Sequence, residues 1–172
     1  MMRSPSTSQE PTLLIERTFD FTREVVFDAW TNPVLLARWF APSGCTIHFA
    51  RIDVRAGGGF HSCLQNPEFG DCWTVADFRE VVRPERIVFA WRIADASGNA
   101  VSPGSQGHDP DWPAETLVAV TFTEKNGRTL VTIAQNVSEA LAKRTGAHPS
   151  WTQMLEKLDK TLAARSPESQ HG

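Results

Sequence analysis

The hydrophobic period changes twice along this chain, and that change limits the folds open to it. Between residues 45 and 135 apolar and polar side chains alternate, which is the period of β-strands. The glycines at 57–59 and the pair Asn126-Gly127 predict two tight hairpin turns. Turn-forming residues divide this stretch into six predicted antiparallel strands, at residues 45–54, 60–65, 72–82, 86–93, 115–124 and 128–135.

Helical periodicity flanks these strands on both sides. Residues 13–21 predict a first strand, after which Thr22 and Asn32 are suitable N-cap residues for two short helices. Near the other end, residues 138–145 predict a further short helix. A long final helix is predicted from four apolar residues that recur every three or four positions, Trp151, Leu155, Leu158 and Leu162.

These elements predict an α+β fold. A curved antiparallel sheet of about seven strands would wrap round the long C-terminal helix, with two short helices after the first strand. A strongly twisted sheet that curls round one helix encloses space, so an internal cavity is expected.

The length and net charge of the chain limit its domain organisation and its possible partners. Its 172 residues, 41% of them hydrophobic, fit a single domain at 12–164, with flexible tails expected at 1–11 and 165–172. The net charge of −3 argues against a nucleic-acid partner, which requires a basic surface. No apolar run approaches roughly 18 residues, so no membrane span is expected.

The cysteines indicate a reducing compartment. Cys45, Cys63 and Cys72 lack the number and spacing of a disulfide framework, and residues 1–11 lack the apolar segment of a signal peptide. We therefore expect a cytoplasmic protein.

Several sequence motifs resemble one known family. In chain order they are FDAWTNP at 27–33, LLARWF at 35–40, IDVR at 52–55 before the glycines at 57–59, PERIVFAW at 84–91, and ETLV at 115–118 before VTF at 120–122. Gly146, Trp151, Leu155 and Leu158 complete the resemblance, which covers roughly residues 13–163. The chain resembles the family named for activators of a heat-shock chaperone ATPase, within the START-like, SRPBCC or helix-grip superfamily.

The resemblance implies the helix-grip fold with a deep hydrophobic cavity, but it implies no single chemistry. The chain resembles only the C-terminal module of the eukaryotic co-chaperones for which the family is named. It departs from the family pattern in two places. The segment 94–113 is longer than the usual connection, and Gln135 and Asn136 stand where many members carry His and Glu.

The candidate cavity residues are mostly large and apolar. Met154 suits a pocket that adapts its shape, and Gln135 and His148 are candidate polar lining groups. Glu80 falls in register with Ala76 and Phe78, so it is either a polar anchor or general base in the cavity or a solvent-facing acid. The complete predicted set is Trp30, Trp39, Phe40, Phe60, Trp73, Phe78, Glu80, Trp91, Gln135, His148, Trp151, Met154 and Leu155.

Catalytic, metal and cofactor motifs are not predicted. No Ser-His-Asp or Cys-His set can be assembled from the sequence, and the glycines at 57–59 lack the helix and lysine of a phosphate loop. Cys45, His48, His61 and Cys63 lie on one predicted hairpin, but strand alternation puts Cys45 and His48 on opposite faces. We expect no cofactor and no stoichiometric zinc.

The leading functional hypothesis is the binding of a small hydrophobic molecule in the cavity. Two alternatives remain open: a cyclase or hydrolase acting on an aromatic or polyketide-like substrate, and a co-chaperone-like interaction module. A homodimer is also left open.

The long connection at 94–113 has two interpretations. It contains three glycines and three prolines, and its apolar residues are few apart from Val101 and Trp112. It is either a lid over the cavity mouth, anchored by Trp112, or a disordered surface loop.

Overall fold

The computed structural model describes residues 12–68 and 70–171, with side chains described up to Ala164. The predicted N-terminal tail at 1–11 lies outside the described residues. The last helix continues to His171, so the backbone of the predicted C-terminal tail is helical at 165–171.

The predicted meander is confirmed as one seven-stranded antiparallel sheet with the strand order β1-β7-β6-β5-β4-β3-β2. The predicted strand limits agree with the observed ones to within three residues. The strands are β1 (Thr12–Phe19), β2 (Thr46–Asp53), β3 (Gly59–Asn66), β4 (Gly70–Val82), β5 (Arg86–Ala94), β6 (Thr116–Lys125) and β7 (Arg128–Ser138).

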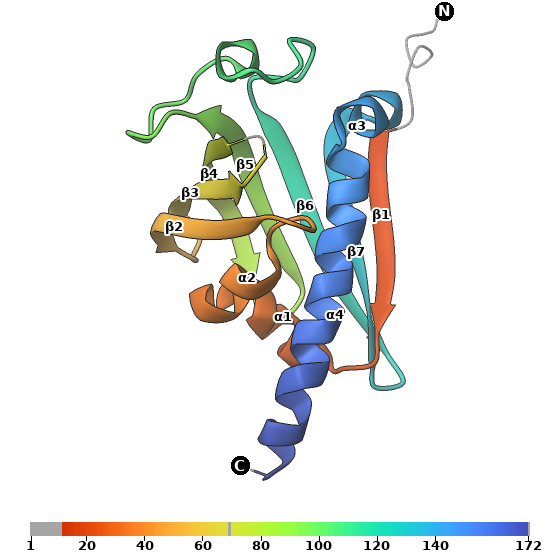
Figure 1. Cartoon of the computed structure of the whole chain (residues 1–172). Coiled ribbons are helices and arrows are strands. Elements are labelled where there is room, and N and C mark those ends of the chain that lie inside the picture. Colours follow the sequence, from red (N-terminus) through yellow and green to blue (C-terminus); the bar gives the residue numbers. More distant parts are fainter. Residues whose placement is uncertain (1–11, 69, 172) are drawn as a thin grey trace, which may run out of the picture.

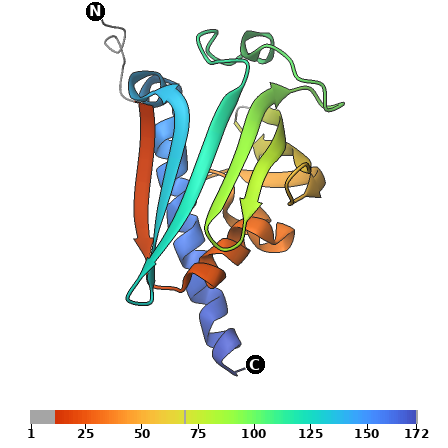
Figure 2. The same ribbon diagram turned by 180° about the vertical axis from the view of Figure 1, so that it is seen from behind.

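The helices also follow the prediction. The long helix α4 crosses one face of the sheet, and the view from behind shows the opposite face uncovered (Figures 1 and 2). Helices α1 and α2 lie beside α4, and the 3-10 helix η1 belongs to the connection between β5 and β6. Their bounds are α1 (Arg23–Thr31), α2 (Pro33–Trp39), η1 (Pro103–Gln106), α3 (Glu139–Thr145) and α4 (Ala147–His171).

Local sequence signals explain where the helices begin. The Asn32 side chain accepts hydrogen bonds from the backbone N–H groups of Val34 and Leu35, at 2.9 and 3.3 Å, and so caps α2. Ser138 caps α3 in the same way, through the N–H of Leu141 at 3.1 Å. Thr22 occupies the N-cap position of α1, but its side chain makes no capping hydrogen bond within the described part of the chain.

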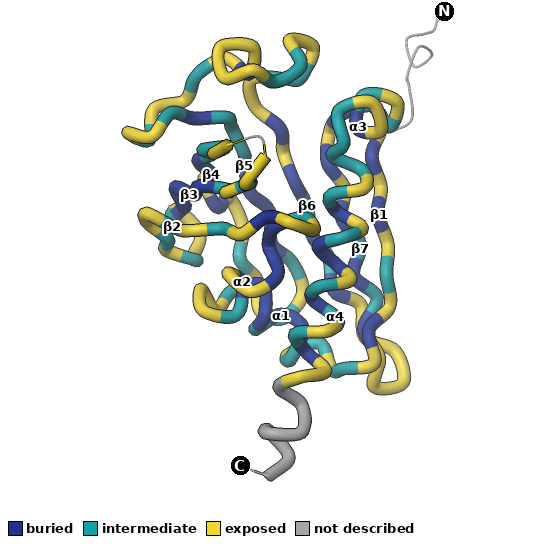
Figure 3. Tube along the Cα trace, in the orientation of Figure 1, coloured by how far each residue is buried: buried dark blue, intermediate teal, exposed yellow. Residues whose placement is uncertain are grey.

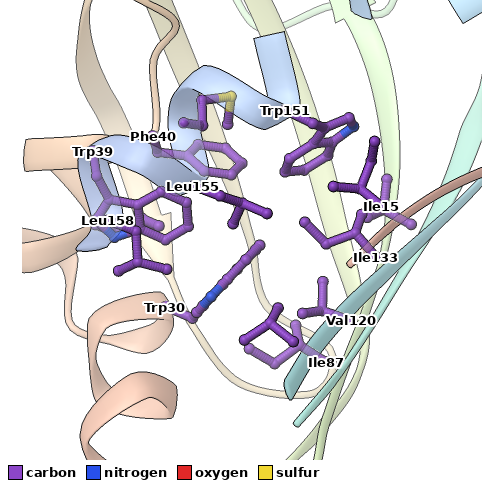
Figure 4. Packing of buried hydrophobic residues seen from close by; sticks show 14 of the residues in the cluster. Ile15, Trp30, Trp39, Phe40, Ile87, Val120, Ile133, Trp151, Leu155 and Leu158 are labelled. Carbon is purple, nitrogen blue, oxygen red and sulfur yellow. The ribbon is translucent and has the colours of Figure 1, made fainter. Parts of the chain in front are cut away.

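The core lies between α4 and the face of the sheet that α4 covers. The four periodic residues of α4, from Trp151 to Leu162, are all buried. In Figure 4, Trp151, Leu155 and Leu158 meet side chains from the sheet, such as Ile133, and from α2, such as Trp39. Buried and exposed positions alternate along β6 and β7 (Figure 3), as expected for a sheet with one covered face.

Candidate ligand-binding pocket

A pocket of about 460 Å³ lies where the first two turns of α4 approach the sheet and the β5–β6 connection. This volume falls within the range of small-molecule sites. Strand residues supply much of its wall, namely Ile47, Ser62, Leu64, Cys72, Thr74, Trp91, Arg92, Ile93, Thr116 and Gln135. The loops and helices supply Phe40, Pro42, Gly107, His108, Asp109, Trp112, Arg144, Thr145, Gly146, Ala147, Ser150, Trp151 and Met154.

Three aromatic rings form the apolar wall of the pocket. The ring centroids of Phe40 and Trp91 lie 5.7 Å apart in a stacked arrangement, and those of Trp91 and Trp151 lie 5.9 Å apart. Phe40 meets Trp151 edge to face at 6.1 Å. Such contacts hold each ring in a defined orientation, so the wall is formed before any ligand enters.

Hydrogen bonds fix both indoles in that wall. The Trp151 Nε1–H donates to Gln135 Oε1 at 3.0 Å, and Gln135 Nε2 donates to Thr116 Oγ1 at 3.1 Å. The Trp91 Nε1–H donates to Thr74 Oγ1 at 3.0 Å. The pocket therefore contains buried polar groups that are already hydrogen-bonded, which is the condition for burying them at low cost.

The charged side chains of the wall are paired. Arg92 binds Asp77 at 2.9 Å and Glu115 at 2.5 Å. Arg144 binds Asp109 at 3.1 Å and Asp111 at 2.9 Å. Hydrogen bonds from the Asp111 backbone N–H and from Arg144 lower the pKa of the Asp109 carboxyl. These pairs place opposite charges side by side at the wall.

A thiol and an imidazole also meet in the wall, and both are uncharged near neutral pH. Cys72 Sγ lies 3.4 Å from His108 Nε2. Burial, with smaller contributions from Cys63 and Cys45, raises the pKa of Cys72 to about 11. Burial lowers the pKa of His108 below its ordinary value.

The structure brings five of the predicted cavity residues to the pocket wall: Phe40, Trp91, Gln135, Trp151 and Met154. Five others lie in the packed core and do not line the pocket, namely Trp30, Trp39, Phe60, Phe78 and Leu155. Trp30, Trp39 and Leu155 face the same interior, but neighbouring side chains surround them (Figure 4). The Phe60 and Phe78 rings pack against each other, with centroids 6.0 Å apart.

Of the two interpretations of Glu80, the structure agrees with the solvent-facing acid, and Glu80 does not line the pocket as the predicted cavity set had it. A bulge in β4 shifts the register, so that Phe78 pairs with Phe89 while Glu80 pairs with the adjacent Val88. One extra residue reverses the alternation, and Glu80 therefore lies exposed, 3.1 Å from Arg86 Nε.

Trp73 and His148 also lie outside the pocket. Trp73 stands between Cys72 and Thr74, which both line the pocket, so its side chain lies on the opposite face of the sheet. There its ring centroid is 4.8 Å from that of His61. Residues 147, 150, 151 and 154 form the helical face that lines the pocket, and His148 is not on it.

Sequence reasoning missed the hydroxyl groups and the charged residues of the wall. Strand alternation from Phe60 identifies Ser62 as a residue of the inner face, and alternation from Phe78 identifies Thr74. No comparable pattern marks His108 or Arg144. The long loop between β5 and β6 brings His108 to the wall, and the last turn of α3 brings Arg144 there.

Two of the hairpin residues considered as metal ligands, His61 and Cys45, make other contacts. His61 Nε2 is hydrogen-bonded to the Asp95 carbonyl oxygen at 3.1 Å, and Cys45 Sγ accepts from Asn66 Nδ2 at 3.2 Å. Among the described residues, no group of three or more His, Cys, Asp or Glu side chains is placed to hold a metal ion.

The sheet, the gripped C-terminal helix and the pocket between them define a helix-grip protein of the START-like, SRPBCC class. Within that class, the chain belongs to the family described as "Activator of Hsp90 ATPase homolog 1-like protein", whose model matches residues 20–163. The family predicted from the motifs is therefore confirmed.

Solved structures share this fold. A protein from Arthrobacter aurescens is 22% identical with a TM-score of 0.75, and covers 88% of this chain and 85% of its own. A protein from Staphylococcus epidermidis is 23% identical with a TM-score of 0.74, and the match covers 91% of this chain and 92% of that protein. The AHSA1 protein from Silicibacter pomeroyi is 21% identical with a TM-score of 0.69, and the match covers 89% of this chain and 98% of that protein. At these identities the likeness establishes the fold alone, and no curated protein matches the sequence.

In the described ranges, no helix combines the length and the apolar character that crossing a membrane requires.

Proposed function

We propose that this protein binds a small hydrophobic molecule in the pocket between α4 and the sheet. The observation that carries the proposal is the preformed aromatic wall of Phe40, Trp91 and Trp151, whose two indole N–H groups are already hydrogen-bonded. An apolar pocket with a few fixed polar groups is the usual form of a small-molecule site. Three free cysteines support a cytoplasmic location for this activity.

The pocket chemistry favours binding over the cyclase or hydrolase alternative. Cys72 and His108 converge as a catalytic pair would, but their pKa shifts oppose nucleophilic catalysis. A thiol attacks as its thiolate, and a pKa of about 11 leaves that form scarce at neutral pH.

The interaction-module alternative draws little support from the exposed apolar surface. The large exposed hydrophobic residues of the described chain belong to four different elements, and they are Leu14, Val34, Val82 and Leu117. We therefore propose a ligand-binding role and no co-chaperone role. A homodimer would be compatible with the ligand-binding role and with the co-chaperone role.

A substitution that fills the pocket should weaken binding. Ser150 lines the pocket from α4, and Ser150→Phe would place a ring in the space that a ligand needs. We expect the affinity for the neutral fluorescent dye Nile red to fall by about 5- to 150-fold, which corresponds to 1–3 kcal/mol of overpacking. Fluorescence titration measures this effect, and a thermal melt checks the fold.

Thr152→Phe is the matched control, because Thr152 is an exposed residue of the same helix and does not line the pocket. This variant should bind Nile red as the parent protein does. Unchanged affinity in Ser150→Phe, with the dye bound by both proteins, would place the binding site elsewhere.

A further inference from the structure

The charged side chains of the pocket wall are already paired, so none of them is free to act as the counter-ion of a charged ligand group. Among the described lining residues, the charged side chains are Arg92, Asp109 and Arg144, and each has an oppositely charged partner at 3.1 Å or less. Cys72 and His108 add no charge near neutral pH. A carboxylate or ammonium entering this pocket would lose water without gaining a counter-ion, which is strongly unfavourable.

Gln135 is the polar group best placed to orient a ligand. It is 2% exposed, lines the pocket, and is held on both sides by Trp151 and Thr116. A carboxamide has two N–H donors and an oxygen that accepts two hydrogen bonds. The contacts with Trp151 and Thr116 use one donor and one acceptor position, so one of each is left for a ligand.

The aromatic wall determines the shape of the ligand body. Trp151 donates its N–H to Gln135, so the polar amide and the aromatic wall adjoin at that indole. Its ring is in turn 5.9 Å from that of Trp91. A flat ring system lying against these indoles would carry a substituent to the amide.

We propose that the pocket selects uncharged aromatic molecules that carry a neutral hydrogen-bonding group, and that Gln135 is the specificity-determining residue that binds this group. The inference rests on the proposed ligand-binding function and assigns the chemical class of its ligand. The Gln135 amide orients the ligand, and the paired charges of the wall exclude its ionised analogues.

Three naphthalenes of similar size test this assignment. 2-Ethylnaphthalene is apolar, 2-acetylnaphthalene adds a neutral carbonyl, and 2-naphthoate carries a charge. Displacement of Nile red from the wild-type protein at pH 7.5 gives the three affinities. We expect the acetyl compound to bind about 2- to 10-fold more tightly than the ethyl compound, as for one net hydrogen bond, and 2-naphthoate to bind most weakly.

Gln135→Met removes the amide while keeping a side chain of similar length. This variant should lose the preference for acetyl over ethyl and should still bind 2-ethylnaphthalene. Gln65→Met is the matched control, since Gln65 is an exposed glutamine on β3 that does not line the pocket. It should keep the wild-type order of affinities.

The outcomes separate the two proposals. Tightest wild-type binding of 2-naphthoate, or equal binding of all three compounds, would overturn the selectivity inference and leave the ligand-binding function intact. A preference for acetyl that survives in Gln135→Met would overturn the role of Gln135. If Nile red and all three naphthalenes fail to bind the wild-type protein, the proposed function itself is wrong. The wild-type comparison decides the selectivity even if Gln135→Met does not fold.

Discussion

Replacing Leu158 by alanine is expected to lower the free energy of unfolding by about 2–5 kcal/mol, the cost of truncating a fully buried leucine. Leu158 is 0% exposed and belongs to the main hydrophobic cluster between α4 and the sheet. Its truncation leaves a cavity inside this cluster (Figure 4). Urea denaturation followed by circular dichroism measures the change.

Leu14→Ala provides the control for this prediction. Leu14 is 54% exposed on β1, so its truncation should change the unfolding free energy by less than about 0.5 kcal/mol. A loss below about 0.5 kcal/mol for Leu158→Ala as well would mean that α4 is not packed on the sheet.

Shortening the β5–β6 connection should accelerate ligand release by about tenfold or more, the equivalent of about 1.4 kcal/mol of lost contacts. This connection supplies Gly107, His108, Asp109 and Trp112 to the pocket wall. It lies at the same end of the sheet as α3 (Figures 1 and 2), where Arg144 binds Asp109 and Asp111. We propose that it acts as a lid.

Replacing residues 97–111 by Asn-Gly and following Nile red dissociation by stopped flow tests the lid. The core should be retained, because α4 packs on the sheet without this loop. Arg144→Gln is a milder companion variant that weakens the anchor to Asp109 and Asp111, and it should accelerate release to a smaller degree. Parental dissociation rates and affinity in the shortened protein would show that the loop is only tolerated surface.

Local signals were sufficient to predict most of the fold. The alternation between residues 45 and 135 identifies the six strands, because consecutive strands in this protein pair with one another and follow the local pattern. Asn32 and Ser138 mark helix starts, because their side chains accept hydrogen bonds from backbone N–H groups two or three positions along the chain. Such short-range contacts can be predicted from the sequence. The pairing of β1 with β7 joins segments far apart in the chain, and no local signal predicts it.

The site was only partly predictable, because it depends on features with no local signature. The bulge that turns Glu80 outward is a shift of one residue between paired strands. Trp39 and Trp91 both point inward, yet only Trp91 lines the pocket. Whether space remains beside a ring is decided by side chains from other elements, and the sequence does not encode that locally.

The tryptophan indole signals in a ¹H–¹⁵N spectrum test the central claim most directly, because three of these residues line the pocket and Trp73 lies on the far face. Assignment uses single Trp→Phe variants, and the probe is 2-acetylnaphthalene. The account predicts that the indole N–H signals of Trp91, Trp112 and Trp151 shift on titration while that of Trp73 stays in place. A saturable shift of Trp73 with the three pocket signals unmoved would contradict it.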